Sequence, residues 1–466
     1  MIENFIGREK DLQNLEDNYH LDHGFVVLYG RRRVGKTTLI QKFIEDKSAL
    51  YFFATEETEA ENRKNFADSL AAFTGHDYLR SAAFPDWESL FRIFAEYAAD
   101  SKKILVIDEF QNLASVNPAF ASVFQKIWDG ILSNYPVMVI LCGSYIRMMT
   151  EHTLSAASPL FGRRTGQILL KPLTFYEYLK YFSGRKSFDE IVTLYALTGG
   201  VPKYLEFFDN RESIWANLKK HVLNPGGYLY EEPVFLLQKE VSETITYFSI
   251  LKAVSLGNRK LSDLASVLEM KANSLSPYLK NLEELRLLER RVPVTELYPE
   301  KSRRGLYYIT DSFMLFWFMF VYPNRGELER GLYEGVLEKI RAGFVQRFLA
   351  FVYEDIAKEI FVHLCDEGAI SFSPVKAGSY WSKETEIDIA ALDENGRIFA
   401  GECKYHAGSK KTGARVYAEL VEKCRAEFGG REVICGLFSN SGFDEDVLKN
   451  ADGVFVSKNK VVKEEK

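Results

Sequence analysis

Hydrophobic runs of strand length alternate with amphipathic segments along the first part of the chain. Residues 25–29, 103–109 and 137–144 each contain a short apolar run, and the last two segments end in polar residues. Residues 38–44, after the first run, place apolar side chains at helical spacing. Short apolar runs separated by helical segments are typical of buried strands in a parallel sheet. The pattern predicts an α/β fold for this region.

Three helical patterns and a hairpin follow in the middle of the chain. Apolar residues recur at helical spacing within residues 245–254, 261–268 and 272–282. Residues 288–294 and 307–309 have strand-like patterns, and the basic loop 301–305 lies between them. Three helices and a hairpin at this spacing resemble a winged helix-turn-helix.

The pattern changes again in the last part of the chain. Residues 345–354 have a helical pattern, whereas residues 384–392 and 398–404 have strand patterns. The turn between these two strands contains Asn395-Gly396, a strong hairpin signal. We therefore expect a second α/β domain at the C-terminal end.

The composition is that of an ordinary globular protein. The 466 residues exceed what one hydrophobic core organises, and 47% are hydrophobic and 27% charged. The most apolar stretch, 313–322, is shorter than the ~20 residues of a membrane span, so it predicts a buried helix. No signal peptide pattern begins the chain, and the five cysteines form no C-x-x-C pair. We expect a cytoplasmic protein that does not enter a membrane.

Residues 30–37 fit the pattern G-x-x-x-x-G-K-[ST] between a predicted strand and a predicted helix. In that setting backbone N–H groups and the helix dipole hold phosphate oxygens. Lys36 reaches the β- and γ-phosphates, and the Thr37 hydroxyl holds Mg²⁺. The alternative, a chance glycine turn, is disfavoured by both flanks. The residues expected to bind the nucleotide are Gly30, Arg31, Arg32, Arg33, Val34, Gly35, Lys36, Thr37 and Thr38.

Polar residues at the ends of the later strands add candidate catalytic groups. Asp108 is expected to hold Mg²⁺, and Glu109 to orient and polarise the attacking water. Ser144 either senses the γ-phosphate or simply ends its strand. Arg163, next to Arg164, either stabilises charge on the transferring phosphoryl group or forms an ion pair at an interface. Both alternatives stay open for Ser144 and for Arg163.

These segments resemble the archaeal-type ATPases of the STAND class within the AAA+ superfamily. Residues 5–9, 29–37, 107–110, 142–144, 159–163 and 199–202 carry the resemblance. It implies that ATP is the nucleotide, and that the proline of a G-x-P motif in a small helical lid packs against its base. Gly200 and Pro202 join the expected site through this resemblance, because the residues alone indicate only a helix-ending turn.

The predicted winged helix is locally basic. The whole chain has a net charge of −6, whereas residues 245–310 hold 11 Lys and Arg against 7 Asp and Glu. This contrast favours a nucleic-acid face with Asn273, Ser274 and Ser276 on the presenting helix. Arg303 and Arg304 would then lie in the wing. The alternative is a winged helix that acts as a wedge between domains or proteins.

The C-terminal hairpin carries a second candidate site. Asp388 and Glu402 can come close enough in it to share a divalent metal, and Lys404 lies on the same side as Glu402. Two carboxylates and a lysine suit metal-assisted phosphodiester cleavage. These residues resemble the PD-(D/E)xK nuclease superfamily, which also implies a role for Glu354 on the preceding helix. The alternative is a surface hairpin with solvated charges.

The expected organisation is α/β with four domains. They are a P-loop NTPase core with a parallel sheet (1–170), a helical lid (171–240), a winged helix-turn-helix (241–325) and a restriction-endonuclease-like α/β domain of the DUF234 type (326–466). The leading hypothesis is an ATPase that switches a DNA-directed effector, with ATP and Mg²⁺ as cofactors. A non-nucleolytic regulator that binds DNA, a protein partner or further copies of itself is the alternative.

Overall fold

The computed structural model describes residues 5–241 and 243–464, and the chain divides into two compact units. Unit 1 comprises Met1–Leu173 and Val201–Lys203, and unit 2 comprises Thr174–Gly200 and Tyr204–Lys466. The first division lies close to the boundary predicted at residue 170. The expected lid, three-helix segment and C-terminal domain pack together in unit 2.

Unit 1 is built on a five-stranded parallel sheet with the order β2-β3-β4-β1-β5. Its central strands carry the apolar runs, which confirms the predicted parallel α/β fold. The sequence interpretation missed the short strands β2 and β5, although β2 is apolar throughout. The strands are β1 (Gly24–Tyr29), β2 (Ala49–Phe53), β3 (Lys103–Asp108), β4 (Val137–Gly143) and β5 (Gly166–Leu169).

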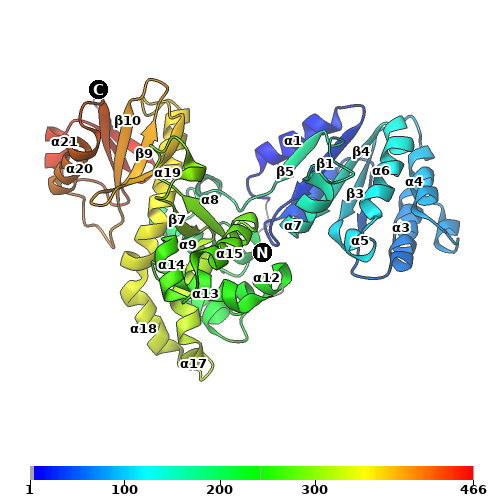
Figure 1. Cartoon of the computed structure of the whole chain (residues 1–466), viewed down its shortest axis with the longest axis horizontal. Helices are drawn as coiled ribbons and strands as arrows, with labels where there is room; N and C mark the ends of the chain where they lie inside the picture. The colour runs from blue at the N-terminus through cyan, green and yellow to red at the C-terminus, as the bar shows by residue number, and fades with distance from the viewer. Residues whose placement is uncertain (1–4, 242, 465–466) are drawn as a thin grey trace. The chain divides into compact units, whose positions relative to one another are not determined.

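Helices cover both faces of this sheet (Figure 1). Alternate residues of β1 point to opposite faces: Phe25 and Val27 enter one core, and Val26 and Leu28 enter the other. The cores are closed by α1 (Glu9–Tyr19) and α2 (Lys36–Ile44) on one face, and by α3 (Glu59–Thr74), α4 (Trp87–Glu96) and α6 (Phe120–Gly130) on the other. The shorter α5 (Gln111–Val116) and α7 (Ile146–Met149) follow β3 and β4.

Unit 2 begins with the helices of the expected lid and continues through the three helices and the hairpin predicted from the sequence. Strands β6 and β7 pair antiparallel. The elements are α8 (Phe175–Phe182), α9 (Phe188–Thr198), α11 (Ile214–Leu218), α12 (Glu232–Glu240), α13 (Thr244–Ser255), α14 (Leu261–Val267), α15 (Ala272–Glu284), β6 (Leu288–Arg291) and β7 (Leu306–Ile309). Helix α10 (Pro202–Leu205) spans the junction of the two units.

The apolar stretch 313–322 is helical and buried, as predicted. Helix α16 (Ser312–Phe316) runs into one π-helical turn, and Phe316, Trp317 and Phe318 have no exposed side-chain surface. None of the helices in the described residues has the length and apolar character needed to cross a membrane. Helices α17 (Arg325–Leu328) and α18 (Tyr333–Gly343) then lead to α19 (Ala350–Asp366).

A six-stranded sheet completes unit 2, in the order β13-β12-β11-β10-β9-β8. The predicted hairpin is the antiparallel pair β9–β10, and β11 runs parallel to β10. Helix α20 contributes Leu420, Cys424 and Phe428 to the core on one face, whereas Phe361 of α19 stacks on Phe399 at 4.3 Å on the other. The elements are β8 (Lys376–Trp381), β9 (Glu386–Leu392), β10 (Ile398–Lys404), α20 (Ala414–Phe428), β11 (Val433–Ser439), α21 (Glu445–Asn450), β12 (Val454–Ser457) and β13 (Lys460–Glu464).

Gly30, which ends β1, is a position where only glycine fits. Its φ is +156°, and an added β-carbon would lie 2.3 Å from the backbone oxygen of Leu170. We expect Gly30→Ala to lower the free energy of unfolding by about 2–3 kcal/mol. The control Gly75→Ala, at φ +73° with open space around it, should lose only about 1 kcal/mol. Equal losses in urea unfolding of the two variants would contradict this prediction.

Candidate functional site

The carboxyl ends of β1, β3 and β4 meet at one edge of the unit 1 sheet, where the predicted nucleotide residues lie. Gly35 is the N-cap of α2 with φ +96°, so the loop amides and the helix N-terminus form a phosphate cradle. The Lys36 ammonium donates to the carbonyl oxygens of Gly30 (2.9 Å) and Arg31 (3.0 Å). Burial lowers the pKa of Lys36, and the nearby Asp108 and Glu109 oppose that shift. The donor set and the cradle fit a bound polyphosphate.

Asp108 and Thr37 lie together, as the magnesium prediction requires. The Thr37 hydroxyl donates to Asp108 Oδ2 at 3.1 Å, and Asp108 is 2% exposed. Tyr51 of β2 also donates to this Oδ2 atom, and burial followed by the charge of Asp108 raises the tyrosine pKa well above its usual range. Tyr51 thus joins the site, and sequence reasoning missed it because β2 was not recognised. A threonine hydroxyl and a carboxylate are ligands that suit Mg²⁺.

Glu109 is held firmly beside this pair. Its backbone has φ +56°, a conformation that costs a non-glycine residue about 1 kcal/mol or more. Ser144 donates to Glu109 Oε2 from its hydroxyl (2.8 Å) and its backbone N–H (3.3 Å), and Gln111 donates to the same oxygen. Ser144 therefore contacts the predicted water-orienting carboxylate, and Gln111 is a neighbour that the sequence interpretation did not include.

The arginines of the site have different surroundings. Arg163 makes a bidentate contact with Asp129, with Nη2 2.9 Å from Oδ2, so the geometry favours the ion-pair alternative. Arg32 donates to the Tyr145 hydroxyl at 2.7 Å.

The other arginines lie in or beside the phosphate-binding loop. Arg31 is 7% exposed, and Arg33 has φ +71° in the turn before α2. Arg8 donates to the carbonyl of the buried Val34 at 2.8 Å, which ties the segment around residue 8 to the loop. Thr38, the last predicted loop residue, is exposed in the first turn of α2.

The predicted G-x-P motif is divided between the two units. Gly199 ends α9 with φ +60° and Gly200 has φ +70°, so both glycines belong to a left-handed helix end. Pro202 is in unit 1, where its Cγ atom lies 3.8 Å from the position of a β-carbon on Gly35. This places Pro202 directly against the phosphate-binding loop.

The C-terminal residues predicted for the second site lie close together in unit 2. Asp388 Oδ2 accepts the backbone N–H of Cys403 at 2.8 Å, across the β9–β10 hairpin. Burial, and then the charge of Glu402, raises the pKa of Asp388 to about 6. Burial, and then the charge of Asp388, raises the pKa of Glu354 on α19 to about 8. We call Glu354, Asp388 and Glu402 the carboxylate cluster.

Two lysines hold Glu402. Lys404 Nζ lies 2.9 Å from its Oε1 atom, and Lys423 Nζ of α20 lies 3.0 Å from its Oε2 atom. Sequence reasoning found Lys404 from the E-x-K spacing but missed Lys423, which no short motif marks. Among the described residues, no three His, Cys, Asp or Glu side chains form a metal-binding group as they stand. The carboxylate oxygens nevertheless suit Mg²⁺, which commonly takes one or two carboxylates together with water.

Comparison with known proteins defines the family. Residues 5–208 match ATPase_2, an ATPase domain predominantly from Archaea, and residues 317–416 match DUF234, archaeal and bacterial proteins of unknown function. An uncharacterized protein of Methanocaldococcus jannaschii, MJECL04, is 35% identical over 424 residues, which cover 90% of this chain and 92% of that protein. The chain belongs to the family of MJECL04. Its N-terminal part is an ATP-binding P-loop ATPase domain.

Two further similarities agree with this assignment. The structure of the Walker-type ATPase PABY2304 of Pyrococcus abyssi has a TM-score of 0.51 at 20% identity, over 68% of this chain and 97% of that one. That likeness shows the fold. A shorter uncharacterized ATP-binding protein of M. jannaschii, MJ0423, is 48% identical over 44 residues, which cover 9% of this chain and 75% of that protein.

Within unit 2, the helices α8 and α9 are bonded to the part of the chain that carries the carboxylate cluster. Glu359 of α19 accepts the backbone N–H groups of Phe175 (3.1 Å) and Tyr176 (2.9 Å) at the start of α8. Asp189 of α9 accepts the Tyr405 hydroxyl at 3.1 Å and the Asn440 amide at 2.9 Å. Tyr405 directly follows Lys404, so α9 contacts the end of the strand that carries Glu402 and Lys404.

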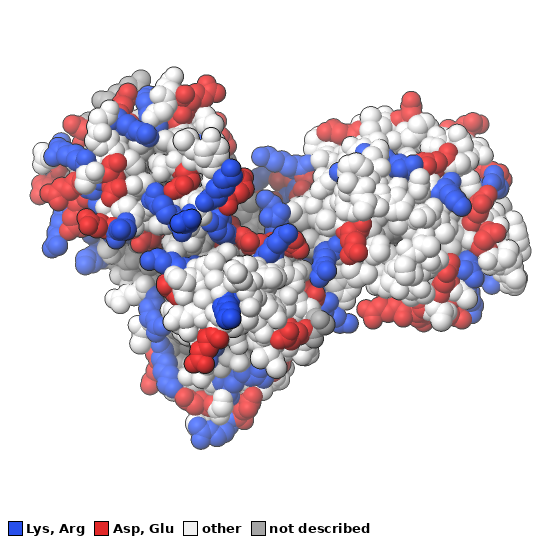
Figure 2. All heavy atoms as spheres, in the orientation of Figure 1, with Lys and Arg blue, Asp and Glu red and all other residues white. Residues whose placement is uncertain are grey.

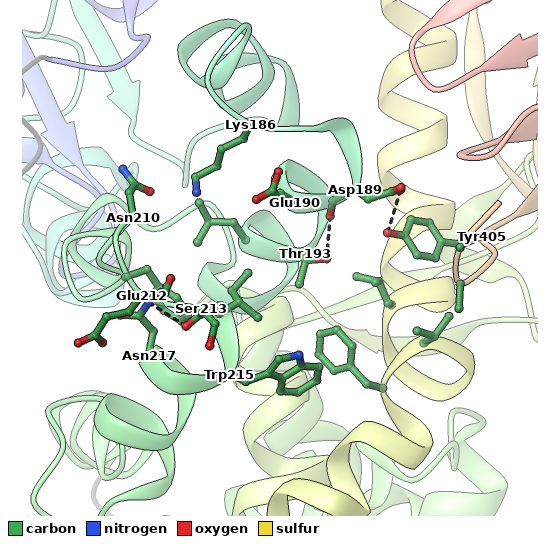
Figure 3. Close-up of a pocket in the computed structure, with 18 of the residues that line it drawn as sticks. Lys186, Asp189, Glu190, Thr193, Asn210, Glu212, Ser213, Trp215, Asn217 and Tyr405 are labelled. Atoms are coloured by element: carbon green, nitrogen blue, oxygen red, sulfur yellow. Dashed lines mark hydrogen bonds between the residues drawn. The ribbon is translucent and has the colours of Figure 1, made fainter.

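A cavity of about 490 Å³ lies beside the second of these contacts. Figure 3 shows the Asp189–Tyr405 hydrogen bond at its edge and the Trp215 ring in its wall. The residues that line it include the apolar Phe344 and Leu349 and the acidic Glu190.

The β6–β7 hairpin also contacts the C-terminal part of unit 2. Arg291 of β6 makes a bidentate ion pair with Asp355 of α19, at 2.8 and 2.9 Å. Arg304 pairs with Glu296 at 3.1 Å and donates to the carbonyl of Trp381, whose indole N–H returns a bond to the Arg304 carbonyl at 3.0 Å. Arg304, expected in a DNA-contacting wing, is thus engaged within the chain although its side chain is 40% exposed, and Arg303 beside it is also exposed.

Lys36 should be essential for nucleotide affinity because its buried ammonium is aimed at the phosphate cradle. We expect Lys36→Ala to weaken ATP binding by about 100-fold or more, measured by calorimetry. Lys42→Ala is the matched control, since Lys42 lies on the same helix in an exposed pair with Glu45. An affinity of Lys36→Ala within about threefold of the parent would contradict this assignment.

Glu354 should make the metal-free protein less stable as the pH rises. Its pKa of about 8 exceeds the usual 4.5, so the folded state keeps a proton that the unfolded chain loses between these values. Stability therefore falls as the pH rises through this range. With EDTA present, Glu354→Gln should raise the melting temperature relative to the parent at pH 8.5. At pH 5 the increase in melting temperature should be smaller. The exposed Glu338→Gln should change neither value, and a lower melting temperature for Glu354→Gln at pH 8.5 would refute the prediction.

Proposed function

We propose that this protein is a nucleotide-driven switch, in which ATP binding and hydrolysis in unit 1 control a metal-dependent, nucleic-acid-cleaving site at the carboxylate cluster of unit 2. The observation that carries the proposal is the pair of polar contacts that join α8 and α9 to α19 and β10. These contacts link the helices preceding Pro202 to the elements that carry the cluster.

In the proposed ATPase reaction the residues of unit 1 have separate tasks. The loop amides and Lys36 bind the phosphates, and Thr37 and Asp108 would hold Mg²⁺. Tyr51 fixes the Asp108 carboxylate through its hydrogen bond. Glu109 orients and polarises the attacking water, and Ser144 and Gln111 keep its carboxylate in place. Arg163 is engaged with Asp129, so no catalytic task is proposed for it.

In unit 2 the proposed chemistry is hydrolysis of a phosphodiester. Asp388 and Glu402 would hold Mg²⁺, which supplies an activated water and offsets charge on the phosphate. Lys404 would bind the phosphate. The raised pKa of Glu354 would let its carboxyl group hold or exchange a proton near Asp388 at neutral pH. The order α19, β8–β9–β10, α20, β11 is compatible with the nuclease-like fold that the resemblance implies.

The coupling follows from the path of the chain. Gly199 and Gly200 end α9, and Pro202, two residues later, lies against the phosphate-binding loop. A change of nucleotide that moves Pro202 would therefore also displace the end of α9, which is only a few residues away along the chain. Because Asp189 binds the loop after β10, and Glu359 binds the start of α8, α9 cannot shift without disturbing these contacts or moving α19 and β10 with it.

The winged-helix resemblance adds nucleic acid as the proposed substrate. Asn273, Ser274 and Ser276 are exposed on α15, and Lys271 and Lys280 flank them. On the face drawn in Figure 2, however, acidic and basic side chains are interspersed. We propose that DNA contact is limited to α15 and Arg303, because Arg304 is hydrogen-bonded to the carbonyl of Trp381 at the end of β8.

A second candidate function is a regulator that cleaves nothing and uses ATP as a conformational latch. The observation that favours it is the occupation of both Glu402 oxygens by lysines, together with the docked Arg304. Under this alternative the cluster is a structural network, and unit 2 binds a protein or DNA without cleaving it.

Cleavage assays separate the two candidates. With linear and branched DNA, Mg²⁺ and ATP, the parent protein should cut, whereas Asp388→Asn should reduce the rate by at least about 100-fold. The exposed Asp446→Asn on α21 is the control and should cut like the parent. Lys36→Ala should abolish the dependence of the rate on ATP. If no Mg²⁺-dependent cutting is seen, or if the cutting does not require Asp388, the nuclease proposal is wrong and the non-cleaving regulator is favoured.

A further inference from the structure

Lys423 is a partner of the carboxylate cluster that neither the motif nor the family assignment explains. It comes from α20, whereas the other members lie on α19, β9 and β10. Its Nζ atom lies 3.0 Å from Glu402 Oε2 and 2.9 Å from the backbone oxygen of Glu386, at the start of β9. With Lys404 on the Oε1 atom, each oxygen of Glu402 is paired with one ammonium group.

The two lysines are more exposed to solvent than the carboxylate that they bind. The side chain of Glu402 is 12% exposed, whereas those of Lys404 and Lys423 are 35% and 32% exposed. The two ammonium groups therefore lie on the solvent side of the buried carboxylate, where an incoming anionic backbone would meet them first. An ammonium is a compact charge with three donors, well suited to a phosphate oxygen.

Charge balance indicates what happens when a divalent cation arrives. A cation bound by Asp388 and Glu402 competes with both ammonium groups for the Glu402 carboxylate, because positive charges gathered around one carboxylate repel one another. Lys423 keeps its bond to the Glu386 carbonyl, which holds it at the edge of the cluster. Its charge is then available to a phosphate of the substrate.

We infer that Lys423 is a second phosphate-binding lysine of this site, which pairs with Glu402 in the metal-free protein and passes to the nucleic-acid backbone once a divalent cation is bound. This inference rests on the proposed function and names a residue of the same site. The competing view is that Lys423 is a structural bridge from α20 to β9 and β10.

The two views predict opposite changes in metal affinity. If Lys423 competes with the cation for Glu402, its removal strengthens cation binding, since one positive charge leaves the cluster. If Lys423 only supports the structure, its removal loosens Glu402 and weakens or does not change cation binding. Metal affinity is a readout independent of cleavage.

The experiment compares Lys423→Met and Lys423→Arg in the full chain. Lys449→Met is the matched control, because Lys449 is an exposed helix lysine of the same part of the chain, 2.9 Å from Glu445. Mn²⁺ binding is measured by calorimetry, retention of a short DNA duplex by gel shift in Ca²⁺, and cutting in Mg²⁺. Asp388→Asn reports whether Mn²⁺ binds at the cluster.

We expect Lys423→Met to bind Mn²⁺ about threefold to tenfold more tightly, to hold DNA about fivefold less tightly, and to cut at least about 30-fold more slowly. Lys423→Arg should regain DNA retention, and Lys449→Met should match the parent. Weaker or unchanged Mn²⁺ binding by Lys423→Met, or unchanged DNA retention, would overturn the inference while leaving the site intact. Mn²⁺ binding that does not depend on Asp388 would instead overturn the proposed function of the cluster.

Discussion

The organisation of unit 2 depends on the need of partly buried carboxylates for partners, and helix α19 carries three of them. A carboxylate removed from water is costly unless hydrogen bonds or opposite charges compensate it. Asp355, whose side chain is 43% exposed, is compensated by Arg291 and Lys358, which hold its pKa well below the usual range. Glu359 is compensated by the first amides of α8, and burial still raises its pKa. Because each acid has a different partner, α19 has to contact the β6–β7 hairpin and the α8–α9 pair at the same time as the sheet.

Glu354 differs from the other two acids in its surroundings, because the charge that affects it most is another carboxylate. Burial, and then the charge of Asp388, raises its pKa to about 8. Networks in which one group remains uncompensated are common at functional sites, since perturbed acids serve proton transfer or metal binding. In the proposed site, the same helix would combine a structural support with a group that holds a proton. Any movement of α8 transmitted through Glu359 reaches Glu354 along a single helix, and this gives the proposed switch a physical route.

Local patterns predicted those parts of the fold and site that depend on near neighbours in the chain. The central strands, the glycine loop and the β9–β10 hairpin followed from apolar runs, a phosphate-binding spacing and an Asn-Gly turn. Tyr51 and Lys423 were missed because their roles depend on pairing between strands and on helix packing, which no short motif encodes. Ser144 and Arg163 show the same limit: their positions were predicted, but only the fold shows that one bonds Glu109 and the other Asp129. Long-range contacts decide what a polar side chain does once the strand has placed it.

Hydrogen–deuterium exchange tests the central claim, the coupling of nucleotide state to the carboxylate cluster, most directly. Exchange should be followed in α19, β10 and residues 405–408 with no nucleotide, with ADP and with a non-hydrolysable ATP analogue. If nucleotide state is coupled to the cluster, the analogue changes protection in these segments, and Glu359→Gln together with Asp189→Asn removes the change while nucleotide affinity persists. Identical exchange of these segments in all three states, with nucleotide bound, would contradict the coupling.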